Sequence, residues 1–282
     1  MRYHEYAPHA VLHDCVKCLW ILEKEYTPDD GEESVVPDAC IELILNVGAP
    51  YRHVGSGGER ELPQAFLIGL LNEPVTLRAR GEVRLVAVRF QAWGLAPLLA
   101  TSAPARNTVS FDLDESWSGI TRAVASHVHA DDYDAAVAHV EEFLIRRRLT
   151  TAFDPRDVRA AAKLLQHSKG QVRIAELADA CFVSARQLER RFADVAGVPP
   201  KTLARMVRFD AIRTRLMFSP AVDLTVLAYE FGYADQAHFI RDFRAFTGTT
   251  PRQFVQEMQA FWSVFADHEN VVFLQSSADS PA

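Results

Sequence analysis

A repeated pattern in the last third of this 282-residue chain constrains its fold more than any other feature. Five positions recur at an offset of 51 residues, apolar for apolar, Gly for Gly and Pro for Pro. The first set is Leu188, Phe192, Val195, Gly197 and Pro200, and the second is Phe239, Phe243, Phe246, Gly248 and Pro251. Leu177-Ala178 recurs as Leu227-Ala228 at an offset of 50, so one residue has been added in between. A period of about 50 residues is typical of a duplicated structural unit.

The first copy has the layout of a helix-turn-helix. Residues 173–181 predict a supporting helix, and a tight turn follows at Phe182-Val183. Ser184 then caps a second helix by accepting a backbone N–H. This second helix carries apolar residues at i, i+4 and i+7, so one stripe is buried. Arg186 and Arg190 point to the opposite side, at about 100° per residue.

The second copy repeats this layout. Residues 224–231 predict the supporting helix, and Gly232 is expected to form the turn. Asp235 is expected to cap the next helix, which has two arginines on its exposed side. A single basic helix face is more often simply solvated, but its duplication favours contact with DNA, where arginine pairs with guanine. A connecting helix at about 200–217 would place both readers in successive major-groove segments, about 34 Å apart.

One run in the second copy is distinctive in its residues. Residues 227–239 read LAYEFGYADQAHF, and Arg241-Asp242-Phe243, Gly248 and Thr250-Pro251 follow. This run resembles the signature of the AraC/XylS family of transcriptional regulators, and the resemblance extends over about residues 157–258. It implies a double helix-turn-helix domain of seven helices. Such a domain activates, or sometimes represses, promoters and often contacts RNA polymerase.

The resemblance also implies which side chains contact DNA. Matching positions place the base contacts on Arg186, Glu189, Arg190, Gln236, Ala237, Ile240 and Arg241. The phosphate contacts fall on Ser184, Arg191, Lys201, Arg244 and Arg252. Glu189 is able to accept from cytosine N4. Ala237 departs from the serine usual in the family, which removes a hydroxyl from that contact but leaves the fold unaffected.

Residues 1–112 have a different pattern. Short apolar runs recur, separated by turn-forming stretches, at 18–22, 41–47, 65–71 and 83–90. This pattern predicts a β-sandwich or a small barrel. Regulators similar to this chain place a cupin-like, effector-sensing barrel in front of the DNA-binding domain. Residues 36–46 resemble a sensor-like branch of the family, which implies a small-molecule effector without identifying it.

Two helices are predicted after the β-rich part. Ser116 is expected to cap the first, and the second covers 132–148. Their apolar stripe either packs across the chain's own barrel or pairs with a second copy in a homodimer, and the sequence leaves both open. Pro155 is expected to open the next helix at its first turn.

The predicted organisation is therefore α+β with two domains and an extension. A β-rich sensor domain occupies 1–150 and includes dimerisation-type helices at about 116–148. An AraC-type DNA-binding domain occupies 155–258, and a C-terminal extension covers 259–282, whose last dozen residues are expected to be disordered.

The charge distribution agrees with this division. The net charge of the chain is −7, which by itself argues against a nucleic-acid partner. Residues 1–154, however, carry 14 Lys and Arg against 23 Asp and Glu, whereas residues 155–258 carry 16 against 11. The acidic N-terminal half thus outweighs a basic C-terminal half in the net charge of the chain. This distribution suggests that the basic part binds a polyanion.

No apolar run approaches the length of a membrane span, and the first residues lack the pattern of a signal peptide. We therefore expect a cytoplasmic bacterial regulator with no membrane partner. Cys15 and Cys18, with His9, His13 and Cys40 nearby, suggest a zinc site as an alternative. Zinc would point to a fused methyl-acceptor module of the DNA-alkylation-repair type, but the second closely spaced ligand pair is missing.

An enzymatic N-terminal domain is the other alternative. His127-x-His129 has the spacing of metal ligands in cupin enzymes, yet it falls in a predicted helix. Residues 55–58 are glycine-rich but fit a hairpin tip better than a phosphate loop. No Ser-His-Asp set is placed for catalysis. We therefore expect neither catalysis nor a cofactor.

Overall fold

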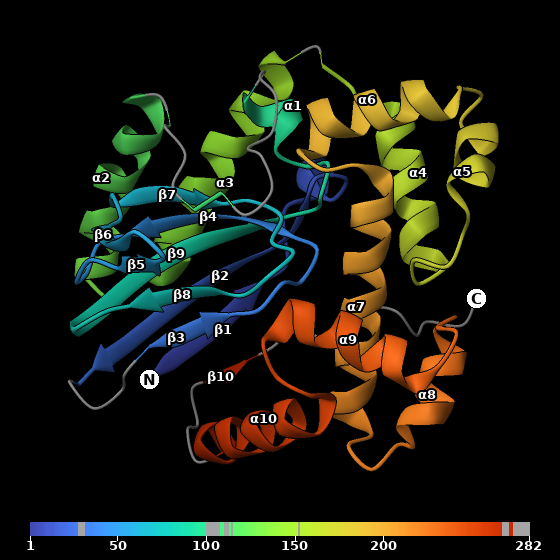
Figure 1. The fold of residues 1–282 in the computed structure, drawn as a ribbon. Coiled ribbons are helices and arrows are strands. Elements are labelled where there is room, and N and C mark those ends of the chain that lie inside the picture. Colours follow the sequence, from blue (N-terminus) through green and yellow to red (C-terminus); the bar gives the residue numbers. More distant parts are fainter. Residues whose placement is uncertain are drawn as a thin grey trace.

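The computed structural model describes residues 1–27, 32–99, 108–109, 113, 115–151, 153–266 and 271–272. Figure 1 shows two β-sheets on one side of the molecule and a group of helices on the other. The chain is thus α+β, with a β-rich N-terminal part and a helical C-terminal part, as the sequence predicts. In the part of the chain that is described, no helix is long and apolar enough to cross a membrane.

The strands form two antiparallel sheets, apart from one short parallel pairing. The first sheet has the order β10-β1-β2-β9-β4-β7. Its strands are β10 (Val271–Val272), β1 (Arg2–Tyr6), β2 (Val16–Tyr26), β9 (Gly81–Phe90), β4 (Ile41–Asn46) and β7 (Ala65–Ile68). The second sheet has the order β3-β8-β5-β6. Its strands are β3 (Glu33–Val35), β8 (Val75–Arg78), β5 (Arg52–Gly55) and β6 (Gly58–Glu61).

The four predicted apolar runs are β2, β4, β7 and β9 of the first sheet. Strands β2 and β9 are buried on both faces, because Leu19 and Val88 point to the helices while Leu22 and Leu85 point to the second sheet. Strand β2 extends beyond the predicted run to Tyr26, since the charged residues after Leu22 remain paired with β9. The second sheet lacks such a run, because strands such as β6 are exposed along their length.

Helices cover the outer face of the first sheet. A 3-10 turn (Ala10–Leu12) precedes β2, and helices α1 (Ala96–Leu99), α2 (Glu115–His129) and α3 (Tyr133–Thr150) follow β9. The prediction that Ser116 caps α2 is wrong, because the helix has already begun at Glu115. An acidic side chain suits that position in the first turn.

The apolar stripe of α2 and α3 packs within the chain's own N-terminal part. Val140 and Leu144 are 1% and 0% exposed in the same core as Leu43 of β4 and Val88 of β9. The ring of Trp117 lies edge-on against Phe143, with the centroids 5.0 Å apart. Of the two alternatives for this stripe, packing across the barrel is the one observed. A homodimer would have to use another surface.

Seven helices, α4 to α10, make up the described part of the chain from residue 156 to 266. They are α4 (Arg156–His167), α5 (Ile174–Ala180), α6 (Ala185–Ala196), α7 (Pro200–Phe218), α8 (Leu224–Glu230), α9 (Gln236–Thr247) and α10 (Pro251–Ala266). Figure 1 shows α7 running between α4–α6 above and α8–α10 below. The predicted connecting helix therefore joins the two units.

The predicted caps are present in both units. The Ser184 hydroxyl accepts from the Gln187 N–H at 3.3 Å, and an Asp235 carboxylate oxygen accepts from the His238 N–H at 2.6 Å. Pro155 differs from the prediction, since it is the N-cap of α4 and Arg156 opens the helix. The last dozen residues are predicted to be disordered. Apart from the two residues of β10, they lie outside the described part of the chain.

Candidate functional site: a duplicated DNA-binding surface and a cavity in the barrel

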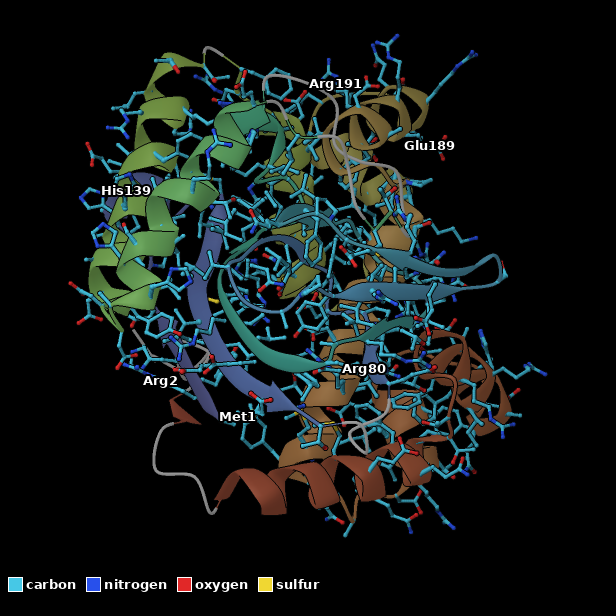
Figure 2. The ribbon with its side chains drawn as sticks, turned by 90° about the vertical axis from the view of Figure 1, so that its left-hand side faces the viewer. Met1, Arg2, Arg80, His139, Glu189 and Arg191 are labelled. Atoms are coloured by element: carbon cyan, nitrogen blue, oxygen red, sulfur yellow. The ribbon has the colours of Figure 1, made fainter. Side chains whose placement is uncertain are left out.

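Helix α6 presents the predicted base-contacting residues of the first unit. Arg186, Glu189 and Arg190 are exposed, while Leu188 and Phe192 on the opposite side are completely buried. Figure 2 shows α6, with Glu189 labelled, at the periphery of the molecule. The buried stripe therefore fixes which face of α6 is offered to a partner.

Helix α9 presents the corresponding residues of the second unit. Ala237 and Arg241 are exposed, and Gln236 and Ile240 are half-buried. The Gln236 side-chain oxygen accepts from the Thr225 hydroxyl at 3.1 Å, which ties the start of α9 to α8. We define the exposed faces of α6 and α9 as the two reading faces.

The arginines on the reading faces are not neutralised by the protein. Within the described residues, Arg186, Arg190, Arg241 and Arg244 form no ion pair. Lys201 and Arg252, two predicted phosphate contacts, are also exposed. Free guanidinium groups on a helix face are suited to pair with guanine edges or phosphates.

Two other predicted phosphate contacts already have partners in the protein. Arg191 forms an ion pair with Asp157 of α4, and the Ser184 hydroxyl is engaged at the start of α6. A phosphate contact from Arg191 would therefore compete with Asp157. These partners orient α6 on its own unit.

A polar cluster and an aromatic core hold α9 against α7. Arg205 pairs with Asp242, and the Tyr233 hydroxyl donates to the other oxygen of Asp242 at 2.8 Å. Burial and the Asp242 charge raise the pKa of Tyr233, so its hydroxyl stays a donor. The ring of Phe209 on α7 stacks on Phe246 at 4.7 Å. The second reading face is thus held by polar and aromatic contacts with α7 and with the segment before α9.

The N-terminal part contacts the helical part away from the reading faces. Asp14 accepts from Arg159 of α4 at 2.9 Å, and Gln166 donates to Gln91 at 3.1 Å. At the other end of the interface, Arg213 of α7 lies within electrostatic reach of Asp38. The acidic N-terminal part therefore pairs with basic residues that the reading faces do not use.

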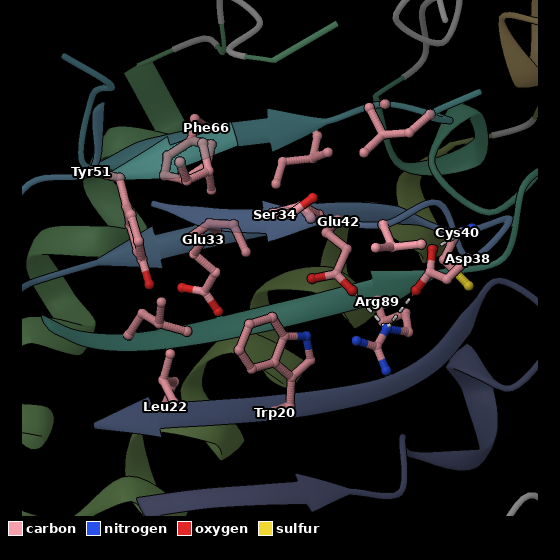
Figure 3. A pocket seen from close by; sticks show the side chains of 18 of the residues that line it. Trp20, Leu22, Glu33, Ser34, Asp38, Cys40, Glu42, Tyr51, Phe66 and Arg89 are labelled. Carbon is pink, nitrogen blue, oxygen red and sulfur yellow. Dashed lines mark hydrogen bonds and ion pairs between the residues drawn. The ribbon is translucent and has the colours of Figure 1, made fainter. Parts of the chain in front are cut away.

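A cavity of about 250 Å³ lies within the β-rich part. Its apolar wall comes mainly from strands of both sheets and includes Trp20, Leu22, Ile44, Phe66, Ile68 and Leu77. Its charged wall consists of Glu33, Asp38, Glu42 and Arg89, which Figure 3 shows, together with Arg213. Because Arg213 belongs to α7, the cavity touches the helix that joins the two reading faces.

Arg89 is the centre of the charged wall. Its side chain donates to Glu42 at 2.6 Å and lies 3.5 Å from Asp38 and 3.4 Å from Glu5. Burial tends to raise the pKa of Asp38, but the charges of Arg89, Arg213 and Lys17 outweigh it and hold that pKa below its usual range. Burial raises the pKa of Glu42, although Arg89 opposes the shift.

The sequence assigned no residue to an effector site, although one segment that it singled out borders this cavity. Asp38, Cys40 and Glu42 belong to residues 36–46, the segment that resembles a sensor-like branch, and all three line the cavity. An acidic residue inside the apolar run of β4 was the available signal. Glu33 and Arg213 were missed, because nothing in their local patterns points to a cavity.

The proposed zinc ligands do not form a metal site. Cys15, Cys18 and Cys40 are buried free cysteines, and burial raises the pKa of Cys15 and of Cys18 to about 12. In the described parts of the chain, no group of three His, Cys, Asp or Glu side chains is arranged to hold a metal. His127 faces the ring of His139 on the neighbouring helix, 5.9 Å away.

Two family matches cover most of the chain. Residues 177–257 match a family described as a helix-turn-helix domain, and residues 4–109 match a domain of unknown function, DUF6597. Together with the duplicated reading faces, the first match defines a DNA-binding protein of the helix-turn-helix class. Within that class, the C-terminal region of the chain carries a helix-turn-helix domain of the AraC type.

Solved structures align with this chain at low sequence identity. The ToxT protein of Vibrio cholerae aligns at 8% identity with a TM-score of 0.45, covering 91% of this chain and 98% of that one. The C-terminal domain of AraT, a response regulator from Geobacillus stearothermophilus, aligns at 18% identity with a TM-score of 0.35, covering 46% and 97%. None of the curated proteins matches this chain.

Proposed function

We propose that this protein is a sequence-specific transcriptional regulator that reads two adjacent major-groove segments and acts at its promoters as an activator. The observation that carries the proposal is the pair of reading faces, whose exposed arginines lack ion pairs within the described residues and are joined by one helix, α7. Base contacts are assigned to Arg186, Glu189, Arg190, Gln236, Ala237, Ile240 and Arg241.

The free arginines favour DNA over a protein partner of mixed charge. Each guanidinium is able to donate two parallel hydrogen bonds to guanine, and neighbouring cations neutralise phosphates. Lys201, Arg244 and Arg252 are exposed and are assigned to phosphates, whereas Ser184 and Arg191 must first exchange their present partners. Such a regulator acts on DNA in the cytoplasm, with RNA polymerase as a further partner.

We assign the N-terminal part the role of a sensor for a small-molecule effector and no catalytic role. The cavity supports this assignment because it is lined by strands of both sheets and has Arg213 of α7 in its wall. An effector bound there would lie next to the interaction between Arg213 and Asp38. An effector that bound more tightly to one position of α7 than to another would favour that position and so shift the spacing of the reading faces.

The test is selection of bound sequences from random duplex DNA by the full chain. We expect two half-sites about one helical turn apart. Arg190→Ala should lower affinity through one half-site and Arg241→Ala through the other. Arg146→Ala is the matched control, since this exposed arginine lies on α3, in the N-terminal part. Sequence-independent binding, weakened equally everywhere by both variants, would contradict the proposal.

A further inference from the structure

The charged wall of the cavity contains more carboxylates than cations. Three carboxylates, from Glu33, Asp38 and Glu42, face two guanidinium groups, from Arg89 and Arg213. Neighbouring charged groups that act on this wall add two carboxylates, Glu5 and Asp210, and one cation, Lys17. The acidic surplus therefore persists.

Both arginines of the wall are already occupied. Arg89 contacts Glu42, Asp38 and Glu5, and Arg213 donates to Asp210 at 2.6 Å. An anionic ligand would have to displace these carboxylates and would leave them buried without a partner, which is costly in a medium of low dielectric constant. The cavity is therefore unsuited to a carboxylate or phosphate ligand.

Glu33 is the carboxylate that lacks a cation. It accepts from the Tyr26 hydroxyl at 2.5 Å, and the Tyr26 and Tyr51 hydroxyls lie 3.1 Å apart. No described Lys, Arg or His forms an ion pair with Glu33. Among the contacts of the described residues, the Tyr26 hydroxyl is thus the donor to this carboxylate, and the Tyr51 hydroxyl contacts only Tyr26, so the charge of Glu33 has no cationic partner.

The remaining wall suits the apolar body of a ligand. Figure 3 shows Glu33 and Glu42 reaching toward the side of the cavity where the ring of Trp20 lies. An aromatic face attracts a cation placed over it, most strongly in the case of Trp. Leu22, Ile44, Phe66 and Leu85 surround this polar end with apolar surface. At about 250 Å³, the cavity is below the roughly 300–1,000 Å³ of sites for drug-sized ligands.

We propose that the cavity binds a compact organic cation, an amine with an apolar or aromatic body, whose ammonium group lies among Glu33, Glu42 and the face of Trp20. An ammonium group donates up to three hydrogen bonds, so it is able to serve both carboxylates at once. Its charge offsets the acidic surplus, and its apolar body fills the space between the sheets. The regulatory role of this amine rests on the function proposed above. Its binding to the cavity is independent of that function.

The experiment is calorimetric titration of the full chain, at neutral pH, with three probes of matched shape. These are 2-phenylethylammonium, the neutral 2-phenylethanol and the anionic 3-phenylpropanoate. We expect saturable binding of the ammonium probe and affinities at least about tenfold lower for the other two, the difference expected for loss of one charge-assisted contact. No binding of the ammonium probe at millimolar concentration, or equal binding of the anion, overturns the proposal.

Three variants locate the site. Glu33→Gln and Glu42→Gln should each weaken binding of the ammonium probe by about tenfold or more, because each removes one charge that faces the amine. Glu25→Gln is the matched control, since Glu25 is an exposed glutamate on β2 that does not line the cavity. Unchanged affinity of both cavity variants would contradict the assignment. The wild-type comparison of probes remains decisive if a variant is unstable.

The same preparation should be assayed for DNA selectivity with and without the ammonium probe. Selective DNA binding without ammonium binding would contradict only the ligand class. Ammonium binding without selective DNA binding would support the cavity assignment and contradict the proposed function. The two proposals therefore fail separately.

Discussion

The two helix-turn-helix units share a layout but differ in what supports them. In the first, α6 buries Leu188, Phe192 and Val195, whereas in the second, α9 buries three phenylalanines at the equivalent positions. Arg191 and Asp242 occupy equivalent positions in the two units but carry opposite charges. Arg191 forms an ion pair with Asp157 of α4, and Asp242 forms one with Arg205 of α7. Duplication thus conserved the geometry while the chemistry of each support diverged.

The turns differ as well. Phe182 and Gly232 occupy equivalent positions, and both adopt the left-handed conformation, with φ of 54° and 73°. Glycine adopts this conformation without strain, but a residue with a Cβ pays about 1–2 kcal/mol. The side chain of Phe182 is also 96% exposed, so it gains nothing from burial. The comparison shows that the first unit tolerates strain that the second avoids.

Core substitution should have the largest effect on this comparison. Phe246→Ala removes a ring that stacks on Phe209, so we expect loss of about 3–5 kcal/mol from the opening free energy of α9. The equivalent change Val195→Ala should remove about 1–2 kcal/mol from α6, since less apolar surface is lost. Hydrogen exchange of the amides in each helix measures both. Equal losses would show that the aromatic core does not distinguish the units.

Substitutions at the contacts with the N-terminal part should have the next largest effect, and should affect the two units differently. Asp38→Asn removes a negative charge that acts on Arg213 near the second unit, and we expect α7 and α9 to lose protection. Asp14→Asn instead removes the charge that faces Arg159, and should loosen α4 and the first unit. Hydrogen exchange resolves the two helices. If both variants loosened both units equally, the interface would act as one body.

The same contact gives a pH dependence with a definite sign. The pKa of Asp38 is held below its usual 3.8, so the folded state favours the carboxylate. Its stabilising contribution is complete above that usual value and is lost as the pH falls through the lowered pKa. The acid-induced loss of protection in α7 should therefore be smaller in Asp38→Asn than in the wild type.

The reading faces should respond to separate substitutions. Arg190→Ala and Arg241→Ala should each weaken binding by about 1–3 kcal/mol, each only on DNA in which its own half-site is intact. Fluorescence anisotropy with operators mutated in one half-site measures this selectivity. If one unit carried all the specificity, one of the two variants would bind DNA with unchanged affinity.

Substitutions in the turns should have the smallest effects, of opposite sign. Phe182→Gly relieves the left-handed strain and should raise the stability of the first unit by about 0.5–1 kcal/mol. Gly232→Ala introduces the same strain into the second unit, with a Cβ 3.3 Å from Gln171, and should lower stability by about 1 kcal/mol. Denaturant unfolding monitored in each unit provides the measurement. Destabilisation by Phe182→Gly would indicate that the exposed ring makes a contact worth more than the strain.

Local sequence patterns specify most of the helical half of this protein. The caps at Ser184 and Asp235, the buried stripes of α6 and α9 and the exposed arginines followed from local periodicity, because each helix carries its own pattern of 3.6 residues per turn. The strands β2, β4, β7 and β9 followed from their short apolar runs between turn-forming stretches. Strands β3, β5, β6 and β8 did not, since their short or polar sequences depend on pairing for their conformation.

How the two halves meet depends on contacts that local sequence patterns do not contain. The cavity assembles Glu33, Glu42, Arg89 and Arg213, which lie as much as 180 positions apart in the sequence. The apolar stripe of α2 and α3 was consistent with two partners until the sheet was present to cover it. Local patterns fix the conformation of a segment, but the choice of its partner depends on contacts between segments distant in sequence. Those contacts form only when the whole chain folds.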